Sequence, residues 1–153
     1  MKIRKALLSD VEKIGIFHYE TFKETYKGLL SEKLLSNLNL DKIILSKKSR
    51  LEDIYIAEIE SEVIAFILFS KKSRYNENYS EIEAIYVGKN YRSNKVGQEL
   101  VELVDKELNK SILVYVLKNN VRAIKFYEKM GFVLTGNERK EGEIETFEML
   151  KEK

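Results

Sequence analysis

Residues 119–132, with the sequence NNVRAIKFYEKMGF, contain the side chain best suited to chemistry, the phenol of Tyr127. The segment begins with asparagine, ends near Gly131 and repeats its apolar residues at the spacing of an amphipathic helix. Tyr127 falls inside the apolar arc, which explains a buried ring but leaves the hydroxyl unexplained. Two interpretations follow: a packed tyrosine bonded to a carbonyl oxygen, or an acid that gives a proton to a leaving group.

The stretch 80–87 holds a second titratable side chain, Glu83, among residue types that favour a strand. A β-bulge would direct one set of apolar residues toward the core: Ile82, Ile85 and Val87. A regular strand would direct another set inward: Ile82, Ala84 and Tyr86. A bulge would also free backbone N–H groups for binding, whereas a regular strand leaves Glu83 as an exposed glutamate. The pattern leaves both alternatives open.

The turn 88–97 leads from this strand into the next predicted helix. A helix N-terminus offers unpaired N–H groups and the positive end of the helix dipole, which together suit a phosphate. Arg92 and Lys95 add positive charge, and Gly97 allows a ligand to approach the backbone closely. The turn therefore indicates a phosphate site, with a solvated basic turn as the alternative.

The elements that would position these residues follow from capping, periodicity and turn signals. Ser9 and Glu12 form a capping box that opens a helix running to about Tyr26. A second helical region, 32–49, is expected to break near 37–41. The remaining elements are expected as helices over 94–108 and 120–130, and as strands over 54–59, 63–71, 80–87, 112–116, 132–137 and 144–150. This order predicts an α/β (α+β) fold with a mixed sheet and helices on both faces.

Composition narrows the class of protein. The 153 residues suit one domain, 1–153, and a net charge of +2 gives no general attraction to nucleic acid or to a membrane surface. Two local basic clusters are expected to be solvated: Lys47, Lys48 and Arg50, and Lys71, Lys72 and Arg74. With no cysteine and one histidine, His18, neither a metal site nor a cysteine nucleophile is expected. His18 lies on an apolar stripe, so we expect a core histidine with its hydrogen bonds satisfied. A cytoplasmic protein is expected.

The three features together resemble the GNAT superfamily of acetyl-CoA-dependent N-acetyltransferases. Residues 120–132 match the family's later motif, N-x-x-A-x-x-F-Y-E-K-x-G-F, at every defining position. The opening IRKALLSDVEKI is similar to the family's first strand and helix. The phosphate loop departs from the usual Arg/Gln-x-x-Gly-x-Gly/Ala, because Lys95 replaces the first glycine. The resemblance covers essentially the whole chain.

The resemblance implies a mostly antiparallel sheet of about seven strands, with two central parallel strands splayed apart around the pantetheine arm of acetyl-CoA. It implies direct attack of an amine on the thioester, with Glu83 as the base and Tyr127 as the acid. A backbone N–H near Ile85 or Tyr86 would stabilise the oxyanion. The implied cofactor-binding residues are Ile85, Tyr86, Val87, Arg92, Ser93, Asn94, Lys95, Val96, Gly97, Asn120 and Tyr127.

The acceptor amine is expected to meet Phe22 and Tyr26, with Glu20 or Glu24 as cation partners. A polyamine or other small amine, an amino-acid derivative and a protein N-terminus all stay open as acceptors, and the family implies a homodimer. No nucleic-acid or membrane partner is expected. The alternative is a non-catalytic acyl-CoA-binding module that acts as a sensor or interaction domain; Lys95 favours it and Tyr127 argues against it.

Overall fold

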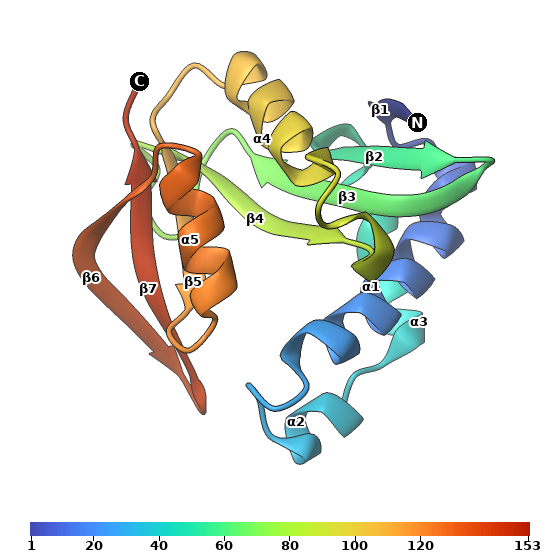
Figure 1. Ribbon diagram of the computed structural model, residues 1–153, viewed down its shortest axis with the longest axis horizontal. Helices are drawn as coiled ribbons and strands as arrows, with labels where there is room; N and C mark the ends of the chain where they lie inside the picture. Colours follow the sequence, from blue (N-terminus) through green and yellow to red (C-terminus); the bar gives the residue numbers. More distant parts are fainter. The chain divides into compact units, whose positions relative to one another are not determined.

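Strands and helices follow one another along the chain in the predicted order. The computed structural model describes residues 1–153. Its strands are β1 (Lys2–Lys5), β2 (Ile54–Ile59), β3 (Glu62–Ser70), β4 (Ser80–Val87), β5 (Ile112–Leu117), β6 (Val133–Glu141) and β7 (Ile144–Lys151). Its α-helices are α1 (Val11–Tyr26), α2 (Glu32–Ser36), α3 (Leu40–Lys48), α4 (Val96–Glu107) and α5 (Val121–Lys129) (Figure 1). None of these helices is both long enough and apolar enough to cross a bilayer.

The strands form a seven-stranded mixed sheet in the order β1-β2-β3-β4-β5-β7-β6. β4 and β5 run parallel, with Ser80 opposite Ile112 and Glu81 opposite Leu113. The pairs β1–β2, β2–β3, β5–β7 and β6–β7 are antiparallel. Helix α4 joins β4 to β5 and supplies the long connection that a parallel pair requires. The predicted mixed, mostly antiparallel sheet of seven strands is confirmed.

Two compact units divide the chain. Unit 1 comprises Met1–Leu68 and Ala84–Leu100, and unit 2 comprises Phe69–Glu83 and Val101–Lys153. Their boundaries fall inside β3, β4 and α4. Unit 1 therefore holds α1, α2, α3 and the last residues of β4, whereas unit 2 holds α5, β5, β6, β7 and the first residues of β4.

The core of unit 1 joins α1 to β2 and β3. Its buried residues are Ala6, Ile14, Ile54, Ile56 and Phe66. Ala84 and Tyr86 of β4 pack against this same cluster. In a regular strand, residues two positions apart point to the same face, and Ala84 and Tyr86 follow this rule. Of the two alternatives for β4, the structure therefore favours the regular strand at these positions.

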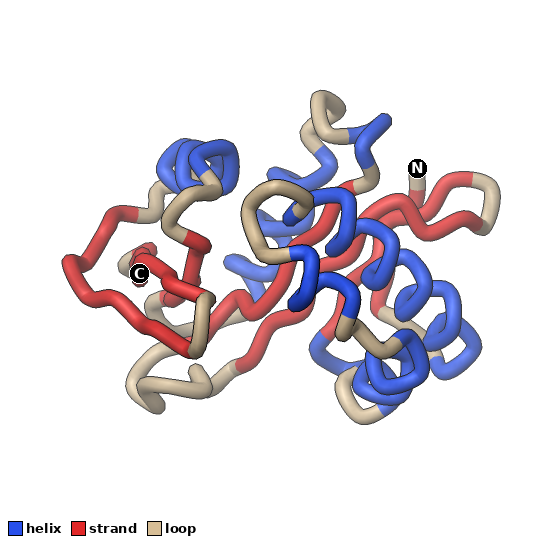
Figure 2. Tube along the Cα trace, turned by 90° about the horizontal axis from the view of Figure 1, so that it is seen from below, coloured by secondary structure: helices blue, strands red, loops and turns tan.

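Unit 2 is built on β5, β7 and β6, and α5 lies against one face of these strands (Figures 1 and 2). Four residues of β5 are buried, so both faces of the strand are covered near its start: Ile112, Leu113, Val114 and Val116. Met149 of β7 pairs with Val114 and is fully buried, as is Phe132 just after α5. The edge strand β6 is exposed along most of its length.

The predicted capping box at the start of the first helix is wrong. A short 3₁₀ turn, Leu8–Asp10, precedes α1 and includes Ser9. The carboxylate of Asp10, two residues before the predicted N3 position, accepts the Leu7 N–H at 2.7 Å and also binds Arg4. The helical turn therefore begins before Ser9, and the side-chain bond at its start runs from the Leu7 N–H to Asp10.

His18 packs against the core of unit 1, as predicted, but the hydrogen bond of its Nδ1 is not satisfied. Its ring stacks on Tyr86 at 5.0 Å and lies 5.4 Å from the ring of Phe66, and its Nδ1 has no hydrogen-bond partner. Burial and the nearby charge of Lys47 lower the pKa of His18 from 6.5 to about 3. Lys47 itself is 3% exposed, so the prediction that it is solvated is wrong.

We expect the protein to lose stability as the pH falls below 6.5, through His18. The folded state keeps the imidazole neutral because its pKa is depressed, whereas the unfolded chain takes up a proton below about 6.5. A fully buried group would give a slope of ~1.4 kcal/mol per pH unit. Because the burial of His18 is incomplete, the free energy of unfolding should fall by only about 1 kcal/mol between pH 6.5 and 5. Urea titrations at several pH values measure it. His18→Phe should flatten this slope, and an equal slope in both proteins would contradict the assignment.

Candidate active site

The turn between β4 and α4 lies in unit 1 and contains the predicted phosphate loop. A 3₁₀ turn, Lys89–Tyr91, is followed by four turn residues, and α4 begins at Val96. The Glu99 N–H donates to the carbonyl of Lys95 at 3.0 Å, which makes Lys95 the residue that precedes the helix. Ser93 and Asn94 are exposed beside it, whereas Val96 and Gly97 are buried. The predicted loop therefore lies at the N-terminus of a twelve-residue helix.

Arg92 of this turn is held by unit 1 itself. Its Nε donates to the carbonyl of Val87 at 3.2 Å, and its terminal nitrogens bind the carboxylate of Glu24 on α1. Glu24 was predicted as a partner for the substrate's cation, and the structure instead pairs it with Arg92. The guanidinium therefore ties the turn to α1 and to the end of β4, and its role toward a phosphate stays a prediction.

Lys95 adopts a backbone conformation that usually belongs to glycine. Its φ of 60° places it in the left-handed region, where a side chain costs about 1–2 kcal/mol. The glycine that the resemblance implies at this position would adopt this conformation without strain, and the chain keeps the conformation with Lys95 in its place. A left-handed residue beside a helix N-terminus turns successive N–H groups toward one point and creates a concavity that suits anions. The turn fits a pyrophosphate in this respect.

We expect Lys95→Gly to raise the free energy of unfolding by about 0.5–1 kcal/mol, because glycine adopts this φ without strain. If the ammonium contacts a phosphate, Lys95→Gly and Lys95→Ala should both weaken acetyl-CoA binding about fivefold. Calorimetric titration measures the dissociation constants. Lys89→Ala, which removes the same charge from the same turn, is the matched control. Unchanged affinity in both Lys95 variants would make Lys95 a surface lysine.

The predicted amine-binding residues form an aromatic cluster in unit 1. Phe22 and Tyr26 of α1 have ring centroids 4.6 Å apart, and Tyr86 lies 6.3 Å from the first and 6.5 Å from the second. Burial raises the pKa of Tyr26, opposed by a hydrogen bond with Tyr86. All three rings are half-buried, so part of each surface stays accessible. The structure thus joins Phe22 and Tyr26 to Tyr86, a residue predicted to bind the cofactor; Ile85 beside it is also half-buried.

In unit 2, α5 carries the two motif residues. Asn120 caps the helix, and its side-chain oxygen accepts the Ala123 N–H at 3.3 Å. Tyr127 is 7% exposed and meets the rings of Phe126 and Phe132 at 5.3 and 5.4 Å. The backbone carbonyl of Tyr127 also accepts the Phe132 N–H at 3.0 Å, which closes the end of the helix. The helix and the buried tyrosine predicted from the sequence are therefore present.

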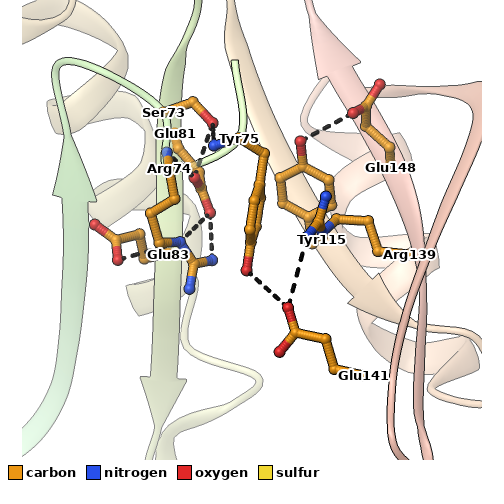
Figure 3. A network of polar contacts seen from close by, with 9 residues as sticks. All are labelled: Ser73, Arg74, Tyr75, Glu81, Glu83, Tyr115, Arg139, Glu141 and Glu148. Atoms are coloured by element: carbon orange, nitrogen blue, oxygen red, sulfur yellow. Dashed lines mark hydrogen bonds and ion pairs between the residues drawn. The ribbon is translucent and has the colours of Figure 1, made fainter. Parts of the chain in front are cut away.

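Glu83 lies on the part of β4 that belongs to unit 2. Its side chain is 9% exposed, so the exposed strand glutamate of the alternative interpretation is wrong. Its Oε1 lies 3.4 Å from Nε of Arg74. Arg74 also binds Glu81, which is fully buried two residues earlier on β4 (Figure 3).

Sequence reasoning missed Arg74 and Glu81. Arg74 was assigned to a solvated basic cluster, yet its guanidinium is held by a buried carboxylate. The available signal was the pair Glu81 and Glu83, two carboxylates at alternate positions of an otherwise apolar strand. Such a pair lies on one face of the strand, and a buried carboxylate requires a partner.

This fold is that of solved N-acetyltransferases. The crystal structure of the PaiA N-acetyltransferase of Thermoplasma acidophilum in complex with coenzyme A superposes with a TM-score of 0.80, at 26% identity over 99% of this chain and 98% of that one. An N-acetyltransferase of Staphylococcus aureus matches in fold with a TM-score of 0.77, at 17% identity over 98% of this chain and all of that one.

Sequence comparison identifies the family to which this chain belongs. Residues 18–132 match the sequence model of the Acetyltransferase (GNAT) family, and the chain belongs to that family as an acetyltransferase. A spermidine N(1)-acetyltransferase of Thermoplasma acidophilum is 26% identical over 86% of this chain and 88% of its own length. A probable N-acetyltransferase of Mycobacterium tuberculosis is 24% identical over 89% and 82%.

Proposed function

We propose that this acetyltransferase transfers the acetyl group of acetyl-CoA directly to a primary amine of a small molecule or peptide. The observation that carries the proposal is α5, with Asn120 at its start and the buried Tyr127 on its inner side, within the region that matches the family. The coenzyme A complex of the similar PaiA enzyme supports the choice of acyl donor.

Acetyl-CoA, when bound, supplies a thioester whose carbonyl carbon the amine attacks. The turn 92–97 would hold its phosphates through backbone N–H groups at the start of α4 and through the side chain of Lys95. Ile85, Tyr86 and Val87 would bind its pantetheine arm along β4, as an added strand binds an edge. Asn120 would contact it at the start of α5.

Two side chains would move protons. Glu83, directly or through water, would take a proton from the acceptor ammonium, and its near-complete burial in unit 2 keeps it from solvent screening. Tyr127 would give a proton to the departing thiolate. A phenol with a pKa of about 10 protonates a thiolate whose conjugate acid lies near 8.5 with only a small uphill step. A backbone N–H near Ile85 or Tyr86 would stabilise the negative charge on the carbonyl oxygen.

The acceptor would meet the half-buried aromatic cluster of Phe22, Tyr26 and Tyr86. Aromatic faces attract ammonium groups, which favours an amine that arrives as a cation. The similar spermidine N(1)-acetyltransferase supports small polyamines as the first acceptors to assay. Residues 1–153 are proposed to act as one domain, in the cytoplasm and as a homodimer.

The test is coenzyme A release across a panel of amines that includes spermidine, smaller diamines, amino-acid amides and a peptide with a free N-terminus. Amine-dependent release with saturation is expected for at least one class. Tight acetyl-CoA binding without amine-dependent turnover would contradict the proposal and would favour the sensor module considered as the alternative. Size-exclusion chromatography with light scattering tests the dimer separately.

A further inference from the structure

We propose that His18 is a specificity-determining residue, which donates a hydrogen bond from its Nε2–H to an oxygen of the acceptor. The acceptors that it favours are amines with a carbonyl or hydroxyl oxygen, such as amino-acid amides and peptides, over diamines and polyamines. This rests on the proposed function, in which the acceptor meets Phe22, Tyr26 and Tyr86. Three features of unit 1 support it: the place of the imidazole, the surroundings of its two nitrogens, and the charge beside it.

The imidazole belongs to the aromatic cluster. His18 and Phe22 lie one helical turn apart on α1, and their ring centroids are 6.0 Å apart. The imidazole also stacks on Tyr86 of β4, with 5.0 Å between the centroids and 29° between the planes. Its third ring neighbour, Phe66, is fully buried, whereas the imidazole is half-buried. An acceptor that covers the accessible surfaces of Phe22 and Tyr86 therefore lies next to the imidazole.

The two ring nitrogens of His18 have different surroundings. Nδ1 is buried and has no hydrogen-bond partner. Nε2 forms no hydrogen bond with the chain either, but it is not buried, so a ligand can reach it. A neutral imidazole carries one proton, on one of these nitrogens. Buried N–H groups without an acceptor are rarer in proteins than buried acceptor atoms without a donor. The proton therefore belongs on Nε2, and His18 is a donor at its accessible nitrogen.

The imidazole stays neutral at working pH. Burial and the nearby charge of Lys47 lower the pKa of His18 to about 3. Lys47 lies on α3, with its Nζ 5.5 Å from the ring centroid of Phe66, the same ring that neighbours the imidazole. Lys47 is the only charged group that shifts this pKa, and no carboxylate offsets it. A ligand beside His18 therefore meets one N–H donor in a positive electrostatic field.

This arrangement discriminates between acceptors. A carbonyl or hydroxyl oxygen beside Nε2 would accept the N–H, and the positive field of Lys47 would favour it. A second ammonium, as in a diamine, has only donors to offer and would be repelled by the same charge. A site that hydrogen-bonds a substrate group rejects analogues without that group, because its own polar atom is then left unpaired. Among the acceptors that the proposed function leaves open, the site favours amino-acid amides and peptides over polyamines.

The test compares glycine amide with ethylenediamine, which differs from it only by a CH₂ in place of the carbonyl. The unaltered protein should use the amide with a kcat/KM about tenfold higher. His18→Phe keeps a ring against Tyr86 and removes both nitrogens, so it should lower this preference about tenfold, mainly through KM for the amide. His18→Gln, whose amide N–H extends about as far as Nε2, should keep most of the preference. Each amine ionises alike in every protein, so the change in the ratio isolates His18.

Tyr19→Phe is the matched control. It removes a polar group from the next residue of α1, a hydroxyl that accepts a hydrogen bond from Lys23 at 3.1 Å. Both kcat/KM values should stay unchanged in this variant. A preference for the diamine in the unaltered protein, or an equal preference in the unaltered protein and in His18→Phe, would overturn the inference.

Nitrogen NMR tests the donor independently of turnover. His18 is the single histidine of the chain, so its imidazole signals are unambiguous. Near neutral pH they should show a proton on Nε2 and none on Nδ1. The Nε2 signal should shift when glycine amide is added to the protein saturated with coenzyme A, and should shift less with ethylenediamine. A proton on Nδ1 would overturn the inference whatever the activity.

Failure of the inference and failure of the proposed function give different results. If no amine of the panel releases coenzyme A from acetyl-CoA, the proposed function fails, and the acceptor role of His18 fails with it. If amines are acetylated but His18→Phe leaves the ratio unchanged, only the inference fails. Loss of acetyl-CoA affinity in His18→Phe would indicate misfolding. His18→Met, which fills a similar space without an N–H, then takes its place in the comparison.

Discussion

Tyr127→Phe should lower kcat about 100-fold while the dissociation constant for acetyl-CoA changes by less than about twofold. Removing a positioned general acid typically costs between about 10² and 10⁴ in rate. The lower end is appropriate here, because water can protonate a thiolate slowly. The ring of Tyr127 packs against Phe126 and Phe132, and phenylalanine preserves those contacts. Cofactor affinity should therefore be retained, and stopped-flow measurement of thiolate release would isolate the affected step.

Tyr115→Phe is the matched control for this experiment. The same atom is removed from another tyrosine of unit 2, whose hydroxyl donates to Glu148 at 2.9 Å. Glu148 keeps two other donors, Thr135 and Asn137, so the expected loss is about 1 kcal/mol of stability with kcat unchanged. An equal fall of kcat in both variants would indicate a general effect of hydroxyl removal in unit 2. Unaltered turnover in Tyr127→Phe would exclude Tyr127 as the acid.

Local signals in the sequence predicted those parts of the fold that depend on near neighbours. Asn120 caps α5 through a residue three positions away, and Tyr127 is buried because its helix has one apolar face. The strands predicted over 54–59 and 63–71 leave only a short connection, in which Glu60 and Ser61 adopt positive φ, 51° and 66°, as a two-residue hairpin turn requires. Each of these features is decided within about four residues, which is the range over which periodicity and capping operate.

Pairings between distant residues could not be predicted in the same way. Arg92 and Glu24 are 68 positions apart, and each was assigned to a separate ligand role before the structure paired them. The fully buried Glu81 and its partner Arg74 lie in different elements, and composition made Arg74 look like part of a solvated cluster. A charged side chain reveals its type in the sequence but not its partner, because the partner is decided by which helices, turns and strands the fold brings together. The residues around Glu83 therefore needed the structure.

Gly15→Ala should destabilise the protein by about 2 kcal/mol, although alanine normally favours a helix over glycine by about 1 kcal/mol. Gly15 lies in the middle of α1 and is buried against α3. A Cβ at this position would lie 2.4 Å from Cγ1 and 2.7 Å from Cα of Ile44. The second contact is with backbone, which cannot rotate away, so the two helices must separate. Overpacking of this kind costs up to about 3 kcal/mol, which exceeds the gain in helix propensity.

Thermal unfolding measures this effect, and the midpoint should fall by about 4–8 °C for a chain of this size. Glu20→Ala, at an exposed position of the same helix, should change stability by less than about 0.5 kcal/mol. In an Ile44→Ala background, Gly15→Ala should cost less but should still destabilise, because the contact with Cα remains. A stabilising Gly15→Ala would mean that α1 and α3 do not approach this closely. Helix α1 also carries Phe22 and Tyr26, the residues proposed to meet the amine. Moving α1 away from α3 should therefore raise KM for the amine more than KM for acetyl-CoA.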